Sequence, residues 1–196
     1  MRCELVSWHR VSRLAELLAV QVVESGFWPE TIIAIGRGGY VPARLLCDLL
    51  DIFDLRSLRV EHYTGTTKHA SARVVDPLCG EVEGRRTLVV DDVSDSGDTY
   101  RVALEHIESF RPAAIRTAAL HHKTVSAYRP DHYAQEVRRW RWLIYPWALK
   151  EDLSALIGTM DSPPTDIGGI VKRLQQDFGV RLPERRIAGL LFPGKS

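Results

Sequence analysis

The stretch from Thr87 to Thr99 constrains the fold of this chain most, because an apolar run leads through two carboxylates into a short glycine-containing loop. Thr87 to Val90 is β-branched and leucine-rich, as expected of a strand buried on both faces in a parallel sheet. Asp91 and Asp92 follow at its carboxyl end, where such sheets bind ligands. The segment from Thr99 to Phe110 is expected to be a helix, whose free N–H groups and positive dipole end favour an anion.

The loop between this strand and helix has the composition of a phosphate-binding turn. It contains, in order, Ser94, Asp95, Ser96, Gly97, Asp98 and Thr99. The backbone N–H groups and hydroxyls of such a turn can close around a phosphate. The alternative is an ordinary strand-to-helix turn with capping Asp and Ser residues. The two adjacent acids directly before the loop favour the binding site.

The residues from Val89 to Thr99 resemble the phosphoribosyl pyrophosphate (PRPP) signature of type I phosphoribosyltransferases, most closely that of the 6-oxopurine enzymes. The resemblance implies that Asp91 and Asp92 hold the ribose 2′- and 3′-hydroxyls, and that the loop from Asp95 to Thr99 holds the ribose 5′-phosphate of PRPP. Ser94, just before this loop, is also expected to bind PRPP. It also implies a Mg²⁺ ion, held in part by Asp92 through PRPP. Asp95 would be the catalytic residue, acting as proton acceptor or donor at N7 of the base.

A second glycine-rich turn lies upstream, after the apolar run Thr31 to Gly36 and before a helix expected from about Val41. It contains Arg37, Gly38 and Gly39. A turn of this kind lets backbone amides approach an anion closely while an arginine supplies charge. Alone it would indicate only a tight turn. The family resemblance makes it the pyrophosphate loop of the PRPP site and implies a cis peptide bond between Gly36 and Arg37.

Contacts to the base are implied further along the chain. Ala113 to Leu120 reads as a strand, with Lys123 expected just beyond its end. The resemblance assigns Lys123 to the exocyclic oxygen of a 6-oxopurine, Trp142 to stacking on the ring, and the backbone of Leu143 to the base edge. Lone lysines are usually solvated and aromatic residues usually pack in cores. Trp140, just before this group, is expected only to pack.

The segment from Thr64 to Gly84 has no clear apolar period before Val74 and is expected to be a long loop. The resemblance implies that a loop at this position closes over the reaction centre and excludes water. Lys68 and Arg73 are its candidates for contacting pyrophosphate. The alternative is a surface loop without such a role.

The composition of the chain bears on whether it acts on nucleic acid, at a membrane or through bound zinc. The chain has 196 residues, is 45% hydrophobic and carries a formal charge of +1, so it can bury a substantial core and has no excess of positive charge that would favour nucleic acid as a partner. No apolar run is long enough to span a bilayer, and the first residues lack the apolar core of a signal peptide. We therefore expect a cytoplasmic protein without membrane partners. The spacing of Cys3, Cys47 and Cys79 indicates neither a disulfide framework nor a zinc site.

Together these features predict an α/β fold, with a mostly parallel sheet flanked by helices as in type I phosphoribosyltransferases. A small hood would include residues 138–147, approximately. We expect a phosphoribosyltransferase domain over residues 1–155 and a C-terminal helical extension over residues 156–196, where the resemblance stops. Two short helices are expected within Asp166 to Leu191. A homo-oligomer, specifically a dimer, is also expected.

The implied reaction transfers phosphoribosyl from PRPP to guanine, xanthine or hypoxanthine in purine salvage, giving a nucleoside 5′-monophosphate and pyrophosphate. One alternative is a regulator of the same fold that binds PRPP or a nucleotide without turnover. It is disfavoured because Lys123 and Trp142 are both present and a single helix is expected before Ile32. A phosphoribosyltransferase for another base is the second alternative.

Overall fold

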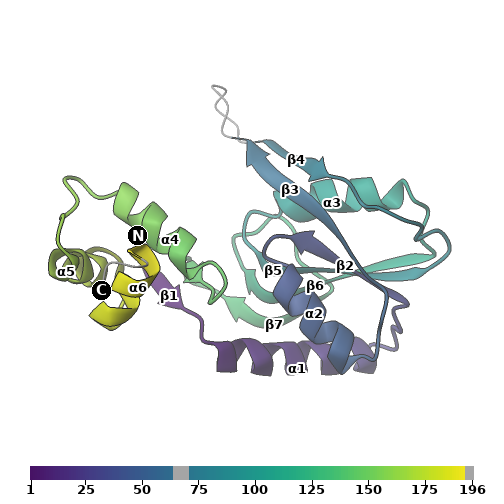
Figure 1. Ribbon diagram of the computed structural model, residues 1–196. Helices are drawn as coiled ribbons and strands as arrows, with labels where there is room; N and C mark the ends of the chain where they lie inside the picture. The colour runs from purple at the N-terminus through teal and green to yellow at the C-terminus, as the bar shows by residue number, and fades with distance from the viewer. Residues whose placement is uncertain (64–70, 193–196) are drawn as a thin grey trace. The chain divides into compact units, whose positions relative to one another are not determined.

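The computed structural model describes residues 1–63 and 71–192, which form two compact units (Figure 1). The central unit runs from Val11 to Trp140. The flanking unit, named for its place in the sequence, combines Met1–Arg10 with Arg141–Ser196. The first helix, α1 (Trp8–Glu24), begins in the flanking unit and continues into the central one.

The central unit is built on a six-stranded sheet with the order β4-β3-β2-β5-β6-β7. All neighbouring strands are parallel except β3 and β4, so the predicted mostly parallel sheet is confirmed. The strands are β2 (Thr31–Gly36), β3 (Leu55–Tyr63), β4 (Ser71–Asp76), β5 (Arg86–Ser94), β6 (Ala114–Lys123) and β7 (His132–Val137). The middle strands β2 and β5 are buried on both faces, as their apolar runs predict.

Helices lie on both faces of this sheet (Figure 1). Helix α2 (Tyr40–Leu49) packs on β2 and β5, while α3 (Asp98–Glu108) packs on β3 and β4. The core beneath α3 contains Tyr100, whose hydroxyl donates a 2.7 Å hydrogen bond to the carbonyl of Ala118. This bond fixes the start of α3 against β6. The ends of β5 and β6 and the start of α3 therefore share one edge of the sheet.

The flanking unit has a small sheet and three helices. Strand β1 (Cys3–Leu5) pairs in parallel with β8 (Trp142–Ile144). The helices α4 (Leu149–Gly158), α5 (Ile167–Phe178) and α6 (Glu184–Leu191) share an apolar core. The Asp166 side chain caps α5 by accepting from the Gly169 amide at 2.8 Å, and Gly179, with φ of 76°, ends it. The two expected C-terminal helices are α5 and α6.

Several elements differ from the sequence reading. Residues 71–76 form β4 instead of belonging to a long loop, and β6 continues through Lys123. Strands β1 and β7 are additional to those expected. The proposed domain boundary at residue 155 falls inside α4, and that division remains a prediction. Within the described part of the chain, no helix has both the length and the apolar character needed to cross a membrane.

Candidate active site

Two adjacent carboxylates lie near the carboxyl end of β5, which continues through them to Ser94. Asp91 is only 7% exposed, whereas Asp92 is half-buried. The Asp92 amide donates to Asp91 Oδ1 at 2.8 Å. Burial, and next the negative charge of Asp92, raise the pKa of Asp91 well above its usual value. The pair is therefore a concentration of negative charge that a cation or hydroxyl donors would stabilise.

The loop after β5 contains a hydrogen bond between its own side chains. The Ser96 hydroxyl donates to Asp98 Oδ2 at 3.0 Å, and Asp98 is the first residue of α3. Its carboxylate thus lies at the amino end of α3, where negative charge is favourable, 3.7 Å from Arg101. Gly97 has a φ of 95°, and a Cβ there would stand 2.6 Å from the Tyr128 amide nitrogen. Both the backbone conformation and the close approach therefore require glycine.

Ser94 and Thr99 flank this loop in different settings. The Ser94 side chain is buried and donates to the Tyr128 carbonyl at 2.7 Å, so its hydroxyl braces the loop against residues 126–128. Thr99 is half-buried in the first turn of α3. Contact of either residue with PRPP remains a prediction.

The upstream loop approaches the acidic pair closely. The Gly36–Arg37 peptide bond is cis, as the family resemblance implies. A Cβ on Gly38 would lie 2.6 Å from the Asp92 carboxyl carbon, and one on Gly39 would lie 2.3 Å from the Val90 carbonyl oxygen. The glycines therefore allow the two predicted PRPP loops to meet at the edge of the sheet.

Lys123 and Asp95 form an ion pair in which the lysine is buried and the aspartate is partly exposed. The Lys123 side chain is 2% exposed, and its Nζ lies 2.5 Å from Asp95 Oδ2. Lys123 is the last residue of β6, in register with β7 on one side, while β5 pairs with β6 on the other. Because a lysine is almost never so buried without a partner, the Asp95 carboxylate is its counter-ion here. The structure brings together the two residues that the sequence assigned to O6 and N7 of the base.

Trp140 contacts both Lys123 and Asp95, although the sequence predicts only a packing role for it. Its indole Nε1–H donates to Asp95 Oδ1 at 3.1 Å, and Lys123 Nζ lies 4.5 Å from the centre of its ring. The prediction that Trp140 serves only in packing was therefore wrong. No local pattern could have found these contacts, because Trp140 lies in the connection after β7 and is far from both partners along the chain.

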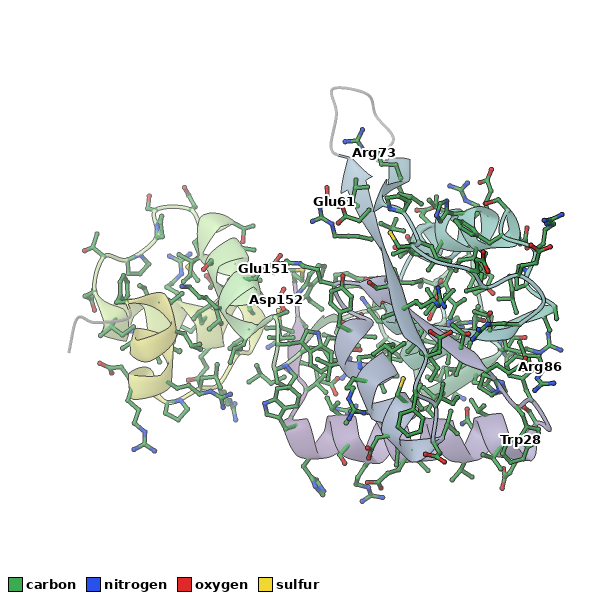
Figure 2. The ribbon with its side chains drawn as sticks, turned by 45° about the vertical axis from the view of Figure 1, so that its right-hand side comes forward. Trp28, Glu61, Arg73, Arg86, Glu151 and Asp152 are labelled. Carbon is green, nitrogen blue, oxygen red and sulfur yellow. The ribbon has the colours of Figure 1, made fainter. Side chains whose placement is uncertain are left out.

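The predicted stacking residue Trp142 belongs to the flanking unit. It is 38% exposed, and its indole Nε1–H donates to Asp152 Oδ1 at 2.9 Å. Burial raises the pKa of Asp152 to about 6; the hydrogen bond from Trp142 opposes this shift, and Glu151 adds to it. Figure 2 shows Glu151 and Asp152 side by side on α4. Leu143 is buried, and the base contacts of both Trp142 and Leu143 remain predictions.

Of the two residues predicted to contact pyrophosphate, Lys68 and Arg73, only Arg73 lies within the described part of the chain. Lys68 lies outside the described residues. Arg73 lies within β4, in register with Glu61 on β3, and Figure 2 shows the two on neighbouring strands. Arg73 is therefore a strand residue instead of a loop residue, because the segment completes an antiparallel hairpin. Its contact with pyrophosphate remains a prediction.

The acidic pair fits the ion that the family resemblance implies. Mg²⁺ prefers oxygen ligands and is commonly held by one or two carboxylates together with substrate phosphates. Asp91 and Asp92 supply such oxygens, next to one another at the carboxyl end of β5. Asp92, the more exposed of the two, is the better placed to reach an ion bound through PRPP.

Comparisons with known proteins agree with this geometry. Residues 2–152 match the model of the phosphoribosyl transferase domain. A xanthine-guanine phosphoribosyltransferase of Gluconobacter oxydans is 34% identical over 144 residues, which span 72% of this chain and 82% of the relative. The crystal structure of a purine phosphoribosyltransferase from Pyrococcus horikoshii aligns with a TM-score of 0.66 and 30% identity, covering 75% of this chain and 94% of that one. A Neisseria gonorrhoeae protein solved with bound ppGpp aligns with a TM-score of 0.66 and 27% identity, covering 77% and 92%.

Proposed function

The chain belongs to the phosphoribosyl transferase domain family and is a phosphoribosyltransferase, and from this premise we propose that it transfers phosphoribosyl from PRPP to a 6-oxopurine in purine salvage. A purine nitrogen forms a bond to the anomeric carbon of the ribose, and the bond from that carbon to pyrophosphate breaks. The purine loses one proton. The products are a nucleoside 5′-monophosphate and pyrophosphate.

The observation that carries this proposal is the ion pair between Lys123 and Asp95. A 6-oxopurine offers an acceptor at O6 and a proton site at N7 on adjacent parts of its ring. A buried ammonium group beside a carboxylate complements these two atoms, because Lys123 donates to O6 while Asp95 handles the N7 proton. General acid-base catalysis of this kind typically contributes about 10²–10⁴-fold to the rate.

The remaining residues of the proposed mechanism bind and orient the substrates. Asp91 and Asp92 accept hydrogen bonds from the ribose hydroxyls, while the loop that ends in Thr99 and the amino end of α3 hold the 5′-phosphate. The amides around Gly38 and Gly39 face the pyrophosphate, with Arg37 as a source of positive charge. Mg²⁺, when bound with PRPP at Asp92, lessens the negative charge on the leaving group. Trp142 and Leu143 orient the base.

The direct test is an assay of pyrophosphate release by the purified chain with PRPP and Mg²⁺ and each base in turn. We expect turnover with at least one of guanine, xanthine and hypoxanthine, and less with adenine. Adenine carries an amino group at position 6, which cannot accept a hydrogen bond from Lys123 as the oxygen of a 6-oxopurine can. Turnover confined to adenine or a pyrimidine would favour a transferase for another base. PRPP binding without turnover on any base would favour the regulator.

We further propose that the enzyme acts in the cytoplasm as a homodimer. The membership of the phosphoribosyl transferase domain family supports this proposal. Sedimentation velocity of the purified chain should show a species of twice the chain mass of 22.2 kDa. A single species at the mass of one chain, 22.2 kDa, would contradict the dimer.

A further inference from the structure

Trp140 contacts both members of the Lys123–Asp95 pair through different parts of its ring system. Its Nε1–H donates to Asp95 Oδ1 at 3.1 Å, whereas Lys123 Nζ donates to Oδ2. Its ring face lies 4.5 Å from the Lys123 ammonium group, within the range of a cation–π interaction. Each carboxylate oxygen of Asp95 therefore has a directed donor, and the carboxylate can rotate only by breaking one of the two hydrogen bonds.

Such an arrangement leaves the pair able to accept a ligand. Each oxygen of a carboxylate has a second lone pair, so Asp95 can still accept a proton or hydrogen bond from a purine nitrogen. The ammonium group of Lys123 is the kind of donor that O6 of a 6-oxopurine accepts. The indole ring contributes to the burial of Lys123, whose side chain is 2% exposed, while Trp140 itself is 44% exposed.

We propose that Trp140 is a positioning residue of the base site, which holds Asp95 and Lys123 in the orientation that a 6-oxopurine meets. The inference rests on the proposed function for its catalytic part. The indole N–H fixes the direction of the Asp95 carboxylate, on which proton transfer depends. The ring face holds the Lys123 ammonium group, on which recognition of O6 depends. The two contacts therefore predict two separable kinetic effects.

Two substitutions separate them. Trp140→Phe keeps an aromatic face for Lys123 and removes the N–H donor, so kcat should fall about tenfold or more, since misdirected catalytic groups lose rate steeply, while KM for the base changes little. Trp140→Ala removes both contacts, so KM for the base should also rise. KM for PRPP should stay at the wild-type value in both. A matched control is Trp28→Phe, because Trp28 is 59% exposed and its recorded hydrogen bond, from Arg86, is to its backbone carbonyl (Figure 2).

Wild-type kcat in Trp140→Phe, or equal losses in both variants and in the control, would overturn the catalytic part. A second measurement needs no turnover. The indole proton of Trp140, assigned by the signal that Trp140→Phe removes, should exchange with solvent more slowly in the wild type than in the double variant Asp95→Ala, Lys123→Met, which deletes the pair without leaving a lone charge. Equal exchange would overturn the positioning contact itself. A wild type inactive on every base would refute the proposed function, and the exchange measurement would still decide whether Trp140 holds the pair.

Discussion

Gly38 lies so close to Asp92 that a Cβ on the glycine would stand 2.6 Å from the carboxyl carbon of the aspartate. The approach joins the two loops predicted to hold PRPP. A Cβ on Gly38 would be close only to the side chain of Asp92, and this short carboxylate can change its rotamer. The neighbouring Gly39 differs, because its Cβ would meet backbone atoms of β2 and β5 at 2.3–2.8 Å.

Alanine substitutions at these two glycines should therefore separate binding from folding. Gly38→Ala should weaken PRPP binding by displacing the Asp92 carboxylate, with a small change in thermal stability. Gly39→Ala should lower the free energy of unfolding by about 1–3 kcal/mol or more, the usual cost of overpacking a core. Calorimetric titration with PRPP and thermal melts measure the two effects. Gly189→Ala is the control, since Gly189 in α6 has open space around its Cβ position, and equal effects of all three would contradict the argument.

Asp92→Asn should stabilise the protein while weakening PRPP binding. The pKa of Asp91 is raised by burial and by the Asp92 charge, so the folded state holds this proton more tightly than the unfolded chain does. Stability from Asp91 therefore falls as pH rises above the ordinary carboxyl range toward the raised folded-state pKa. Removing the neighbouring charge relieves part of this loss. The melting temperature should exceed that of the wild type at pH 7.5, and the difference should shrink toward pH 5.

The same substitution should lower PRPP affinity about tenfold to a hundredfold, as expected for the loss of a hydrogen bond to a charged group. Asp161→Asn, which removes an exposed acid from the flanking unit, controls for net charge. A lower melting temperature of Asp92→Asn at pH 7.5, or unchanged PRPP binding, would count against the assignment of the pair.

Asp95→Asn should reduce both turnover and stability, because Asp95 is proposed as the proton acceptor and is the counter-ion of Lys123. We expect kcat to fall about 10²–10⁴-fold while PRPP affinity changes little. Stability should fall by about 1–3 kcal/mol, less than for a fully buried pair because the Asp95 side chain is 38% exposed. Kinetics and chemical denaturation measure these effects.

Adding Lys123→Met to Asp95→Asn provides the control for this prediction, because it removes the charge that the first change leaves without its counter-ion. The double variant should regain most of the lost stability and none of the lost turnover. Recovery of turnover, or wild-type kcat in Asp95→Asn alone, would refute the role of the carboxylate in proton transfer.

Asp152 should make the flanking unit more stable as the pH falls toward 5. Burial raises its pKa to about 6, with the Trp142 indole opposing the shift and Glu151 adding to it. The folded state therefore binds a proton that the unfolded chain releases between about pH 4 and 6, so stability falls as pH rises through this window. Cys3 also interacts with Asp152, but burial raises the pKa of its thiol, against the lowering effect of the N-terminal ammonium group, so it titrates well above this range.

The difference in melting temperature between the wild type and Asp152→Asn isolates this contribution from those of other carboxylates. It should shift in favour of the wild type between pH 7.5 and pH 5. Glu151→Gln serves as the control and should retain the pH dependence. A difference that stays constant with pH would show that Asp152 titrates at an ordinary carboxyl pKa.

Local sequence was sufficient for the elements that carry continuous apolar runs or clear caps. Strand β2 has the predicted bounds, and α1 begins directly after Ser7, whose hydroxyl accepts from the Arg10 amide. Asp166 and Gly179 bound α5 as their residue types predict. In each case the decisive interaction lies within a few residues of the element, where sequence patterns are informative.

The elements that were missed depend on distant partners. The polar end of β6, His121 to Lys123, resembles a loop, yet it pairs with Val93 and Ser94 of β5 and with residues 135–137 of β7. Strand β4 has mixed polar and apolar residues and is defined by its pairing with β3. The contact between Trp140 and Asp95 likewise follows from how the sheet brings β5, β6 and the end of β7 together, which no local window contains.

The pairing of β1 with β8 bears on how the chain is made. Residues 3–5 leave the ribosome early, but their partner strand at 142–144 emerges only after the whole central unit has been synthesised. The central unit can therefore fold while translation continues, whereas β1 must wait. Because closing such a long segment is entropically costly and slow compared with local contacts, the small sheet is expected to form last. A nascent chain whose residues have emerged from the ribosome as far as residue 140, with the later residues still enclosed, would then carry a folded central unit with a free β1.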